Sequence, residues 1–220
     1  MKLLLTSAGI KNASINDAMV ELLGKPIAET DALCIPTATY AMSGPPSSYR
    51  FITGTATTPM CELGWRSLGV LELTALPSLA EEEWTGWVRE TDVLLANGGD
   101  SLYLTYWMRE SGLLDLLPSL EDKVWVGLSG GSMVFTPNIG KDFMHWPTPD
   151  GSDRALGVVD FSIFPHLDHP NLPTNTMADA EKWAAELSGP GYAIDDQTAI
   201  RVVDGTVDVI SEGHWKLFNA

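Results

Sequence analysis

The sequence predicts a three-layer α/β fold in which helices cover both faces of a mainly parallel sheet and an antiparallel meander closes the chain. Short apolar segments alternate with longer segments whose apolar residues recur every three or four positions, the spacing of one face of a helix. The apolar segments are hydrophobic at nearly every position, as in strands covered on both sides of a parallel sheet. Together these patterns are typical of an open sheet between two helical layers.

The first half of the chain contains four predicted strands and four predicted helices. The strands are expected at residues 2–6, 32–36, 70–73 and 93–96. The helices are expected at residues 12–23, 58–67, 78–90 and 102–110. The third helix starts at Ser78, and Glu81 follows at the spacing of a capping box. Residues 37–48 are rich in alanine, serine, proline and glycine, so we expect a loop there.

The second half extends the sheet and then changes in pattern. A fifth buried strand is expected at residues 124–128, and shorter strands at 161–164 and 192–194 flank a helix at 175–187. The last three strands, at residues 199–203, 206–210 and 214–218, are joined by turns such as Asp204-Gly205 and predict an antiparallel meander. No linker or internal repeat interrupts the chain, so residues 1–220 are expected to form a single domain.

The composition of the chain restricts the cellular compartment and the binding partners that we expect for the protein. A formal net charge of −16 argues against binding to nucleic acids or anionic membranes. The apolar run at residues 1–5 is too short for a signal peptide, and no stretch approaches the length of a membrane span. Two cysteines, Cys34 and Cys61, provide no disulfide framework, so we expect a cytoplasmic protein. The eight tryptophans are expected mainly in the core, and a homodimer interface stays open.

The most informative motif is Gly127-Leu128-Ser129-Gly130-Gly131, which directly follows an apolar strand. This G-x-S-x-G spelling is that of a nucleophile elbow, a sharp turn from strand to helix that exposes one serine. Similar Gly/Ser turns also bind phosphate or no ligand at all. Ser132 is a competing nucleophile, but it lies a turn into the helix. The motif therefore favours Ser129 as the nucleophile of a hydrolase.

Further polar residues follow other strands, and the carboxyl ends of parallel strands share one edge of a sheet. His166 follows residues 161–164, and Asp195-Asp196 follows residues 192–194. Histidine is suited to take the serine proton near neutral pH, and an acid then orients its ring. The amides of Gly99 and Gly130 are candidates for the two donors of an oxyanion hole.

Two other interpretations of these residues stay open. Gly98-Gly99 is also consistent with a plain tight turn. His166, Asp168 and His169 could instead ligate a metal, although the chain has only four histidines and no second matching cluster. The serine-hydrolase interpretation requires no cofactor.

These landmarks resemble the dipeptidase E (aspartyl dipeptidase) family of serine peptidases, which is related to cyanophycinase. The resemblance rests on Asn97-Gly98-Gly99-Asp100, the elbow, Pro165-His166, and the stretch at residues 192–199. It implies a fold like that of class I glutamine amidotransferases, a flavodoxin-like arrangement, with Ser129 as nucleophile and His166 as base. The third member of the triad is implied at Asp142 or at Asp196, and we favour Asp196 because it lies at a strand end facing the expected site.

The sequence departs from the family pattern at three places. Gly130 stands where an alanine is usual, and Asp100 stands where an asparagine is usual. The aspartyl-specific members carry an arginine after the histidine, whereas no arginine follows His166 until Arg201. We therefore expect a serine peptidase that hydrolyses short peptides, with cleavage after an N-terminal aspartate left open. An isopeptidase or esterase, and an amidotransferase-like binding domain without activity, are the alternatives.

Overall fold

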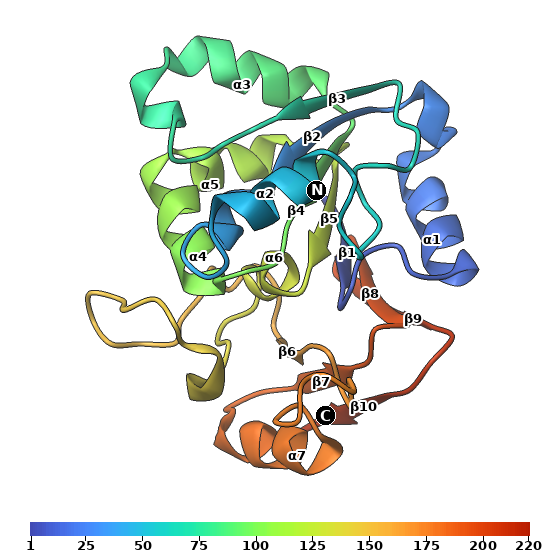
Figure 1. Ribbon diagram of the computed structural model, residues 1–220, viewed down its shortest axis with the longest axis vertical. Coiled ribbons are helices and arrows are strands. Elements are labelled where there is room, and N and C mark those ends of the chain that lie inside the picture. The colour runs from blue at the N-terminus through green and yellow to red at the C-terminus, as the bar shows by residue number, and fades with distance from the viewer.

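The computed structural model describes all 220 residues and contains two sheets, with the smaller one below the larger in Figure 1. The larger sheet has seven strands in the order β3-β2-β4-β5-β1-β8-β9. These strands are β1 (Lys2–Thr6), β2 (Asp31–Ile35), β3 (Ser67–Val70), β4 (Val93–Ala96), β5 (Val124–Leu128), β8 (Thr198–Val203) and β9 (Thr206–Ser211). The smaller sheet, in the order β10-β7-β6, contains β6 (Ser162–Phe164), β7 (Gly191–Ile194) and β10 (Trp215–Phe218).

Helices connect most of the parallel strands. The α-helices are α1 (Ala13–Leu23), α2 (Pro45–Ile52), α3 (Glu81–Glu90), α4 (Ser101–Glu110), α5 (Leu113–Leu116), α6 (Gly130–Met133) and α7 (Met177–Glu186). Short 3-10 helices are η1 (Ile27–Glu29), η2 (Thr37–Thr39), η3 (Leu76–Ser78), η4 (Leu117–Ser119) and η5 (Lys141–Phe143). Each of these helices is too short or too polar to traverse a lipid bilayer.

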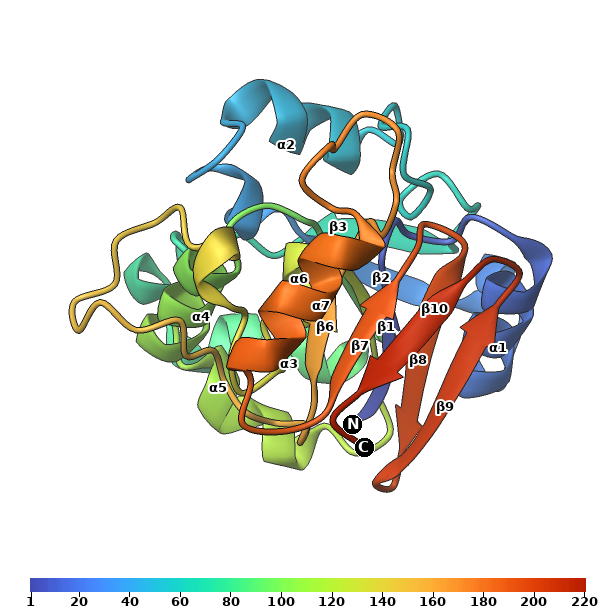
Figure 2. The same ribbon diagram turned by 90° about the horizontal axis from the view of Figure 1, so that it is seen from below.

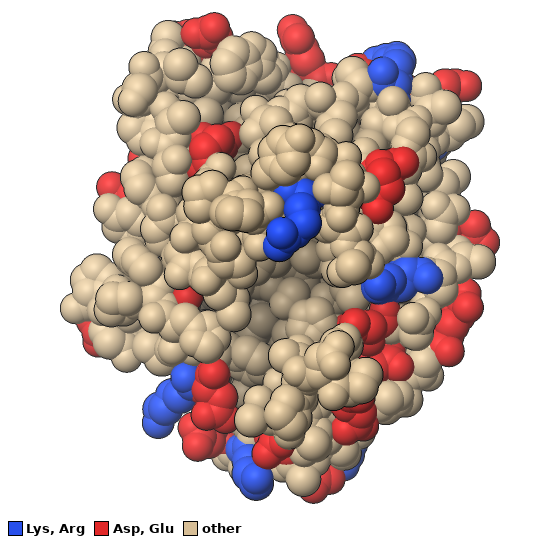
Figure 3. Space-filling model, viewed as in Figure 1, with Lys and Arg blue, Asp and Glu red and all other residues tan.

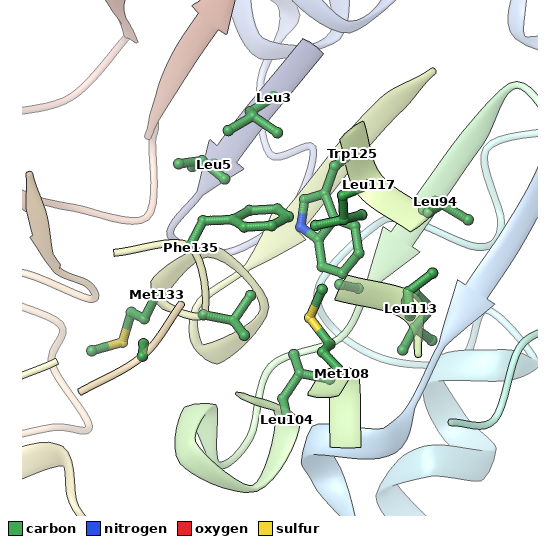
Figure 4. Packing of buried hydrophobic residues seen from close by; sticks show 14 of the residues in the cluster. Leu3, Leu5, Leu94, Leu104, Met108, Leu113, Leu117, Trp125, Met133 and Phe135 are labelled. Carbon is green, nitrogen blue, oxygen red and sulfur yellow. The ribbon is translucent and has the colours of Figure 1, made fainter. Parts of the chain in front are cut away.

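The central strands bury both faces, which explains their unbroken apolar sequences. Along β1, Leu3 and Leu5 pack into one hydrophobic cluster, whereas Leu4 packs into a second cluster on the opposite face with residues of α1. The first cluster includes Trp125 and Phe135, whose ring centroids are 4.8 Å apart and which lie side by side in Figure 4. It also includes residues of β6 and β7, so the two sheets share one core.

The pairing of the strands brings several chain segments to one edge. Strand β5 lies between β1 and β4 and is parallel to both, so the residues after these strands, Ser7, Asn97 and Ser129, lie at the same edge of the larger sheet. Strands β6 and β7 are also parallel to each other. In Figure 2, α7 lies across this smaller sheet. The prediction of a mainly parallel three-layer fold is confirmed.

Several predicted elements need correction. Residues 37–48 are not a loop throughout, because they contain η2 and the start of α2, whose first residue is Pro45. The helix expected at residues 58–67 is absent, and turns place Met60 and Cys61 in the core instead. The strand expected at 70–73 is β3, three residues earlier. Helix α3 begins at Glu81 after an Ala80 N-cap, so the capping box at Ser78 does not form.

The C-terminal strands are antiparallel to their partners but do not form one meander. Strands β8 and β9 make a hairpin at the edge of the larger sheet, whereas β10 pairs with β7 in the smaller sheet. The turn at Gly213-His214 packs on the carboxylate of Asp195, which accepts a 2.8 Å hydrogen bond from the His214 amide. A side chain at Gly213 would overlap this carboxylate. The contact directs the chain onto β7 rather than back along β9.

Helix α7 supports the smaller sheet and provides a test of the fold. Thr176 and Asp179 form a reciprocal capping box at its first turn. We expect Thr176→Ala to lower the free energy of unfolding by about 1 kcal/mol, because an amide donor at the helix start loses its acceptor. Urea unfolding measures the change. Thr176→Ser, which keeps the hydroxyl, is the matched control, and an equal loss in both variants would contradict this role of the cap.

Candidate active site

Ser129 occupies the turn between β5 and α6 in a backbone conformation that L-residues rarely adopt. Its φ is 49° and its ψ is −112°. The amide of Ser129 donates to the Thr6 carbonyl at 3.0 Å, and its own carbonyl accepts from the amide of Met133 at 2.9 Å. These bonds hold the turn in place and leave the Ser129 hydroxyl without a hydrogen-bond partner in the protein. The geometry is that of the predicted elbow.

The glycines around Ser129 are required by close backbone contacts. A Cβ atom at Gly127 would overlap the Gly131 carbonyl, and one at Gly131 would overlap the Ala96 carbonyl. A Cβ atom at Gly130 would overlap the carbonyl oxygen of Gly99. This last contact favours glycine at position 130 of this chain.

Ser132, the competing nucleophile, is fully buried. Its Oγ donates to the Thr6 carbonyl at 2.8 Å, and Ser132 does not line the cavity described below. The hydroxyl therefore braces the elbow against β1 and is not available to a substrate.

His166 and Asp196 come together although they are 30 residues apart in the sequence. His166 follows β6 and Asp196 follows β7, and these two strands run side by side. The distance from His166 Nδ1 to Asp196 Oδ1 is 2.7 Å, which is a short, charge-assisted hydrogen bond. With Nδ1–H donated to the carboxylate, the other ring nitrogen, Nε2, is free to accept a proton.

The carboxyl group of Asp196 favours its ionised form. Burial opposes ionisation, but the hydrogen bond and the charge of His166, together with a hydrogen bond from Ser7, outweigh burial and lower the pKa of Asp196. A carboxylate is thus present across the neutral range to orient the imidazole and to stabilise its charged form.

Ser129 and His166 line the same cavity, which has a volume of about 760 Å³. Figure 3 shows this face hollowed at its centre, with a basic group at the rim over α2. No hydrogen bond joins the Ser129 hydroxyl to His166 in this structure. Hydrogen bonds between catalytic residues are often long until a substrate binds and closes the site. The evidence that Ser129 and His166 can act together is therefore the cavity that both residues line.

Asp142 and Asp196 occupy different positions relative to the His166 ring. Asp142, in η5, is exposed, lines the cavity and makes no hydrogen bond to His166. Asp196 does not line the cavity and lies behind the ring, bonded to Nδ1. Of the two candidate acids, only Asp196 contacts the histidine.

Of the two candidate oxyanion donors, Gly99 lines the cavity and Gly130 does not. Gly99 has a φ of 131°, and a side chain there would overlap the Ala38 carbonyl. The Gly99 peptide packs directly against Gly130. As the first residue of α6, Gly130 has no intrahelical acceptor for its N–H. The Gly130 N–H is therefore available as a hydrogen-bond donor.

The residues considered as metal ligands do not converge. Asp168 accepts from the Met177 amide and lies 3.0 Å from His214 Nε2, whereas His169 Nε2 lies 3.7 Å from Asp196. No group of three His, Cys, Asp or Glu side chains is arranged to hold a metal ion.

Two residues at this site were missed by the sequence interpretation. Ser7 contacts both His166 and Asp196, and Arg50 is the only lysine or arginine that lines the cavity. Ser7 directly follows β1, so the rule of strand ends could have identified it. Arg50 lies in α2, which begins with two prolines at positions that suit a helix start.

Comparisons with known proteins agree with this fold. A crystal structure provisionally described as a peptidase E protein from Listeria monocytogenes EGD-e has a TM-score of 0.68 and 21% identity, covering 96% of this chain and 98% of that one. The crystal structure of a peptidase from an acI-B1 Actinobacterium has a TM-score of 0.72 and 18% identity, covering 100% and 94%. At such identities the likeness establishes the fold alone. No curated protein matches the sequence significantly.

The sequence itself matches a family model. The model described as "Peptidase family S51" matches residues 3–210, a range that includes the elbow, His166 and Asp196. The chain therefore belongs to peptidase family S51 and is a serine peptidase.

Proposed function

We propose that this protein hydrolyses short peptides, with Ser129 as nucleophile, His166 as general base and Asp196 as the acid that orients the base. The observation that carries the proposal is the 2.7 Å contact between His166 Nδ1 and Asp196 Oδ1 beside a cavity that Ser129 also lines. It gives the imidazole the tautomer that a serine nucleophile requires. In this proposal, residues 1–220 act as one peptidase domain.

The reaction proceeds through an acyl-enzyme. His166 Nε2 takes the hydroxyl proton as Ser129 Oγ attacks the scissile carbonyl, and Asp196 stabilises the resulting imidazolium. The amides of Gly99 and Gly130 donate to the oxyanion of the tetrahedral intermediate. The imidazolium then protonates the leaving amine, the C–N bond breaks, and a water activated by the same ring releases the acyl group.

The lining of the cavity supports a small substrate with a free carboxylate. Its volume lies in the range of small-molecule pockets. Arg50 donates to Ser47 Oγ at 3.0 Å and forms no ion pair, although acidic residues outnumber basic ones by 29 to 13. Asp142 is the only acidic residue that lines the cavity. We propose that Arg50 binds the terminal carboxylate of a short peptide.

The nucleophile is tested by Ser129→Ala. We expect kcat for dipeptide hydrolysis to fall by about 10³-fold or more, because the attacking oxygen is lost. Thermal unfolding should be nearly unchanged, since the hydroxyl makes no hydrogen bond within the protein. A fluorophosphonate probe should label the wild type and the matched control Ser132→Ala, but not Ser129→Ala. Labelling that persists in Ser129→Ala would show that another residue is the nucleophile.

The third member of the triad is tested by comparing two aspartates. We expect Asp196→Ala to lower kcat by about 10²- to 10⁴-fold, because His166 loses the group that fixes its tautomer. Asp142→Ala should change kcat by less than about tenfold, since Asp142 does not contact the ring. Steady-state kinetics on one dipeptide measures both. The reverse order of the two effects would assign the role to Asp142.

The role of Arg50 is tested by Arg50→Met. We expect KM for dipeptides to rise by about five- to tenfold, because a charge-assisted hydrogen bond to the carboxylate is lost. KM for the corresponding dipeptide amides, which lack that charge, should stay the same. The control is Arg66→Met, which removes an equal charge from a residue that pairs with Asp31 outside the cavity. Equal effects on dipeptides and amides would exclude a carboxylate at Arg50.

A further inference from the structure

The end of β1 joins the two halves of the proposed triad. The Thr6 carbonyl accepts from the amide of Ser129 at 3.0 Å and thereby holds the elbow. The next residue, Ser7, bonds to both His166 and Asp196, which belong to the smaller sheet. Two consecutive residues of one strand end therefore position the nucleophile on one side and the base with its acid on the other.

The hydroxyl of Ser7 is buried and makes contacts that define its proton. Ser7 is 0% exposed. Its Oγ accepts a 2.8 Å hydrogen bond from the His166 amide and lies 3.1 Å from Asp196 Oδ1 and 3.5 Å from His166 Nδ1. Since Nδ1 carries a hydrogen that points to Asp196, it cannot accept the Ser7 proton. The Ser7 hydroxyl therefore donates to Asp196 Oδ1, the same oxygen that Nδ1 contacts.

These contacts also support a backbone that is unfavourable for histidine. His166 has a φ of 56°, in the left-handed region. Its amide hydrogen bond to Ser7 Oγ is the contact that ties this residue to β1. Without it, the histidine would depend on the bonds of its neighbours, such as that from the Leu167 amide to the Ile194 carbonyl at 3.0 Å.

We propose that Ser7 is a positioning residue for catalysis: its hydroxyl fixes the backbone of His166 and directs the Asp196 carboxylate onto the ring. This role rests on the proposed function, because it acts through the base and its acid. Ser7 itself does not line the cavity, so it touches no substrate.

Ser7 also helps to keep Asp196 ionised, because its hydrogen bond is one of the contacts that lower the pKa of that carboxyl against the effect of burial. The hydroxyl of Ser7 and Nδ1 of His166 share Oδ1, and His169 Nε2 lies 3.7 Å from Oδ2 on the other side of the carboxylate. Removal of the Ser7 hydroxyl therefore leaves the carboxylate with one contact fewer to hold it against the ring.

The test is Ser7→Ala in the full chain, measured by kcat and KM separately. We expect kcat to fall by about 10- to 100-fold with KM for a dipeptide nearly unchanged, because the ring is misplaced while the cavity is intact.

The matched control is Ser162→Ala, which removes another buried hydroxyl. Ser162 lies in β6, and its Oγ donates to the Asn138 carbonyl at 2.8 Å, away from His166 and Asp196. We expect a loss of stability in both variants but a fall in kcat at unchanged KM only in Ser7→Ala. A Ser7→Ala enzyme with wild-type kcat would overturn the proposal for Ser7 alone. A wild type that neither hydrolyses dipeptides nor reacts with a fluorophosphonate would overturn the proposed function, and the role of Ser7 with it.

Discussion

The hydrogen bond between His166 Nδ1 and Asp196 Oδ1 is the interaction on which the proposed chemistry depends. It exists because β6 and β7 are parallel neighbours, so the residues that follow them emerge at the same edge of the smaller sheet. The bond turns Nε2 away from the carboxylate and keeps Asp196 ionised. A serine hydroxyl at the edge of the larger sheet then needs only to reach that nitrogen.

Backbone strain is concentrated around this bond. Ser129, His166 and Asp168 all have positive φ values, and they lie in the two loops where the sheets meet. Such conformations are unfavourable for L-residues and persist only where surrounding contacts fix them. Here the contacts come from the end of β1 and from glycine peptides packed on one another, as where Gly130 lies against Gly99. The fold thus stabilises the exposed serine and the histidine by backbone contacts rather than by the cavity itself.

The sequence predicted the central strands well, because burial on both faces leaves an unbroken apolar run that few other structures require. The same reasoning failed where tertiary contacts decided the outcome. The helix expected at residues 58–67 does not form, and Met60 and Cys61 reach the core from turns instead. The pairing of β10 with β7 depends on the contact of Gly213 with Asp195, which no local pattern contains.

The candidate site, too, could be predicted from the sequence only in part. Ser129 has a motif, and His166 and Asp196 follow predicted strands, so all three could be named from the sequence. The sequence favoured Asp196 over Asp142 because Asp196 follows a predicted strand, and the structure places only Asp196 in contact with the His166 ring. Ser7 follows a predicted strand end, but its contacts with His166 and Asp196 require the fold. Arg50 carries no motif and is recognised only when α2 is placed at the cavity.

The most direct measurement is a crystal structure of the protein after reaction with a fluorophosphonate, since the adduct imitates the tetrahedral intermediate. Our account predicts phosphorus bonded to Ser129 Oγ, a phosphonyl oxygen within hydrogen-bond distance of the Gly99 and Gly130 amides, and His166 Nε2 facing the adduct with Nδ1 still on Asp196. An adduct on another residue, or a His166 ring bonded to Asp142 instead of Asp196, would contradict it.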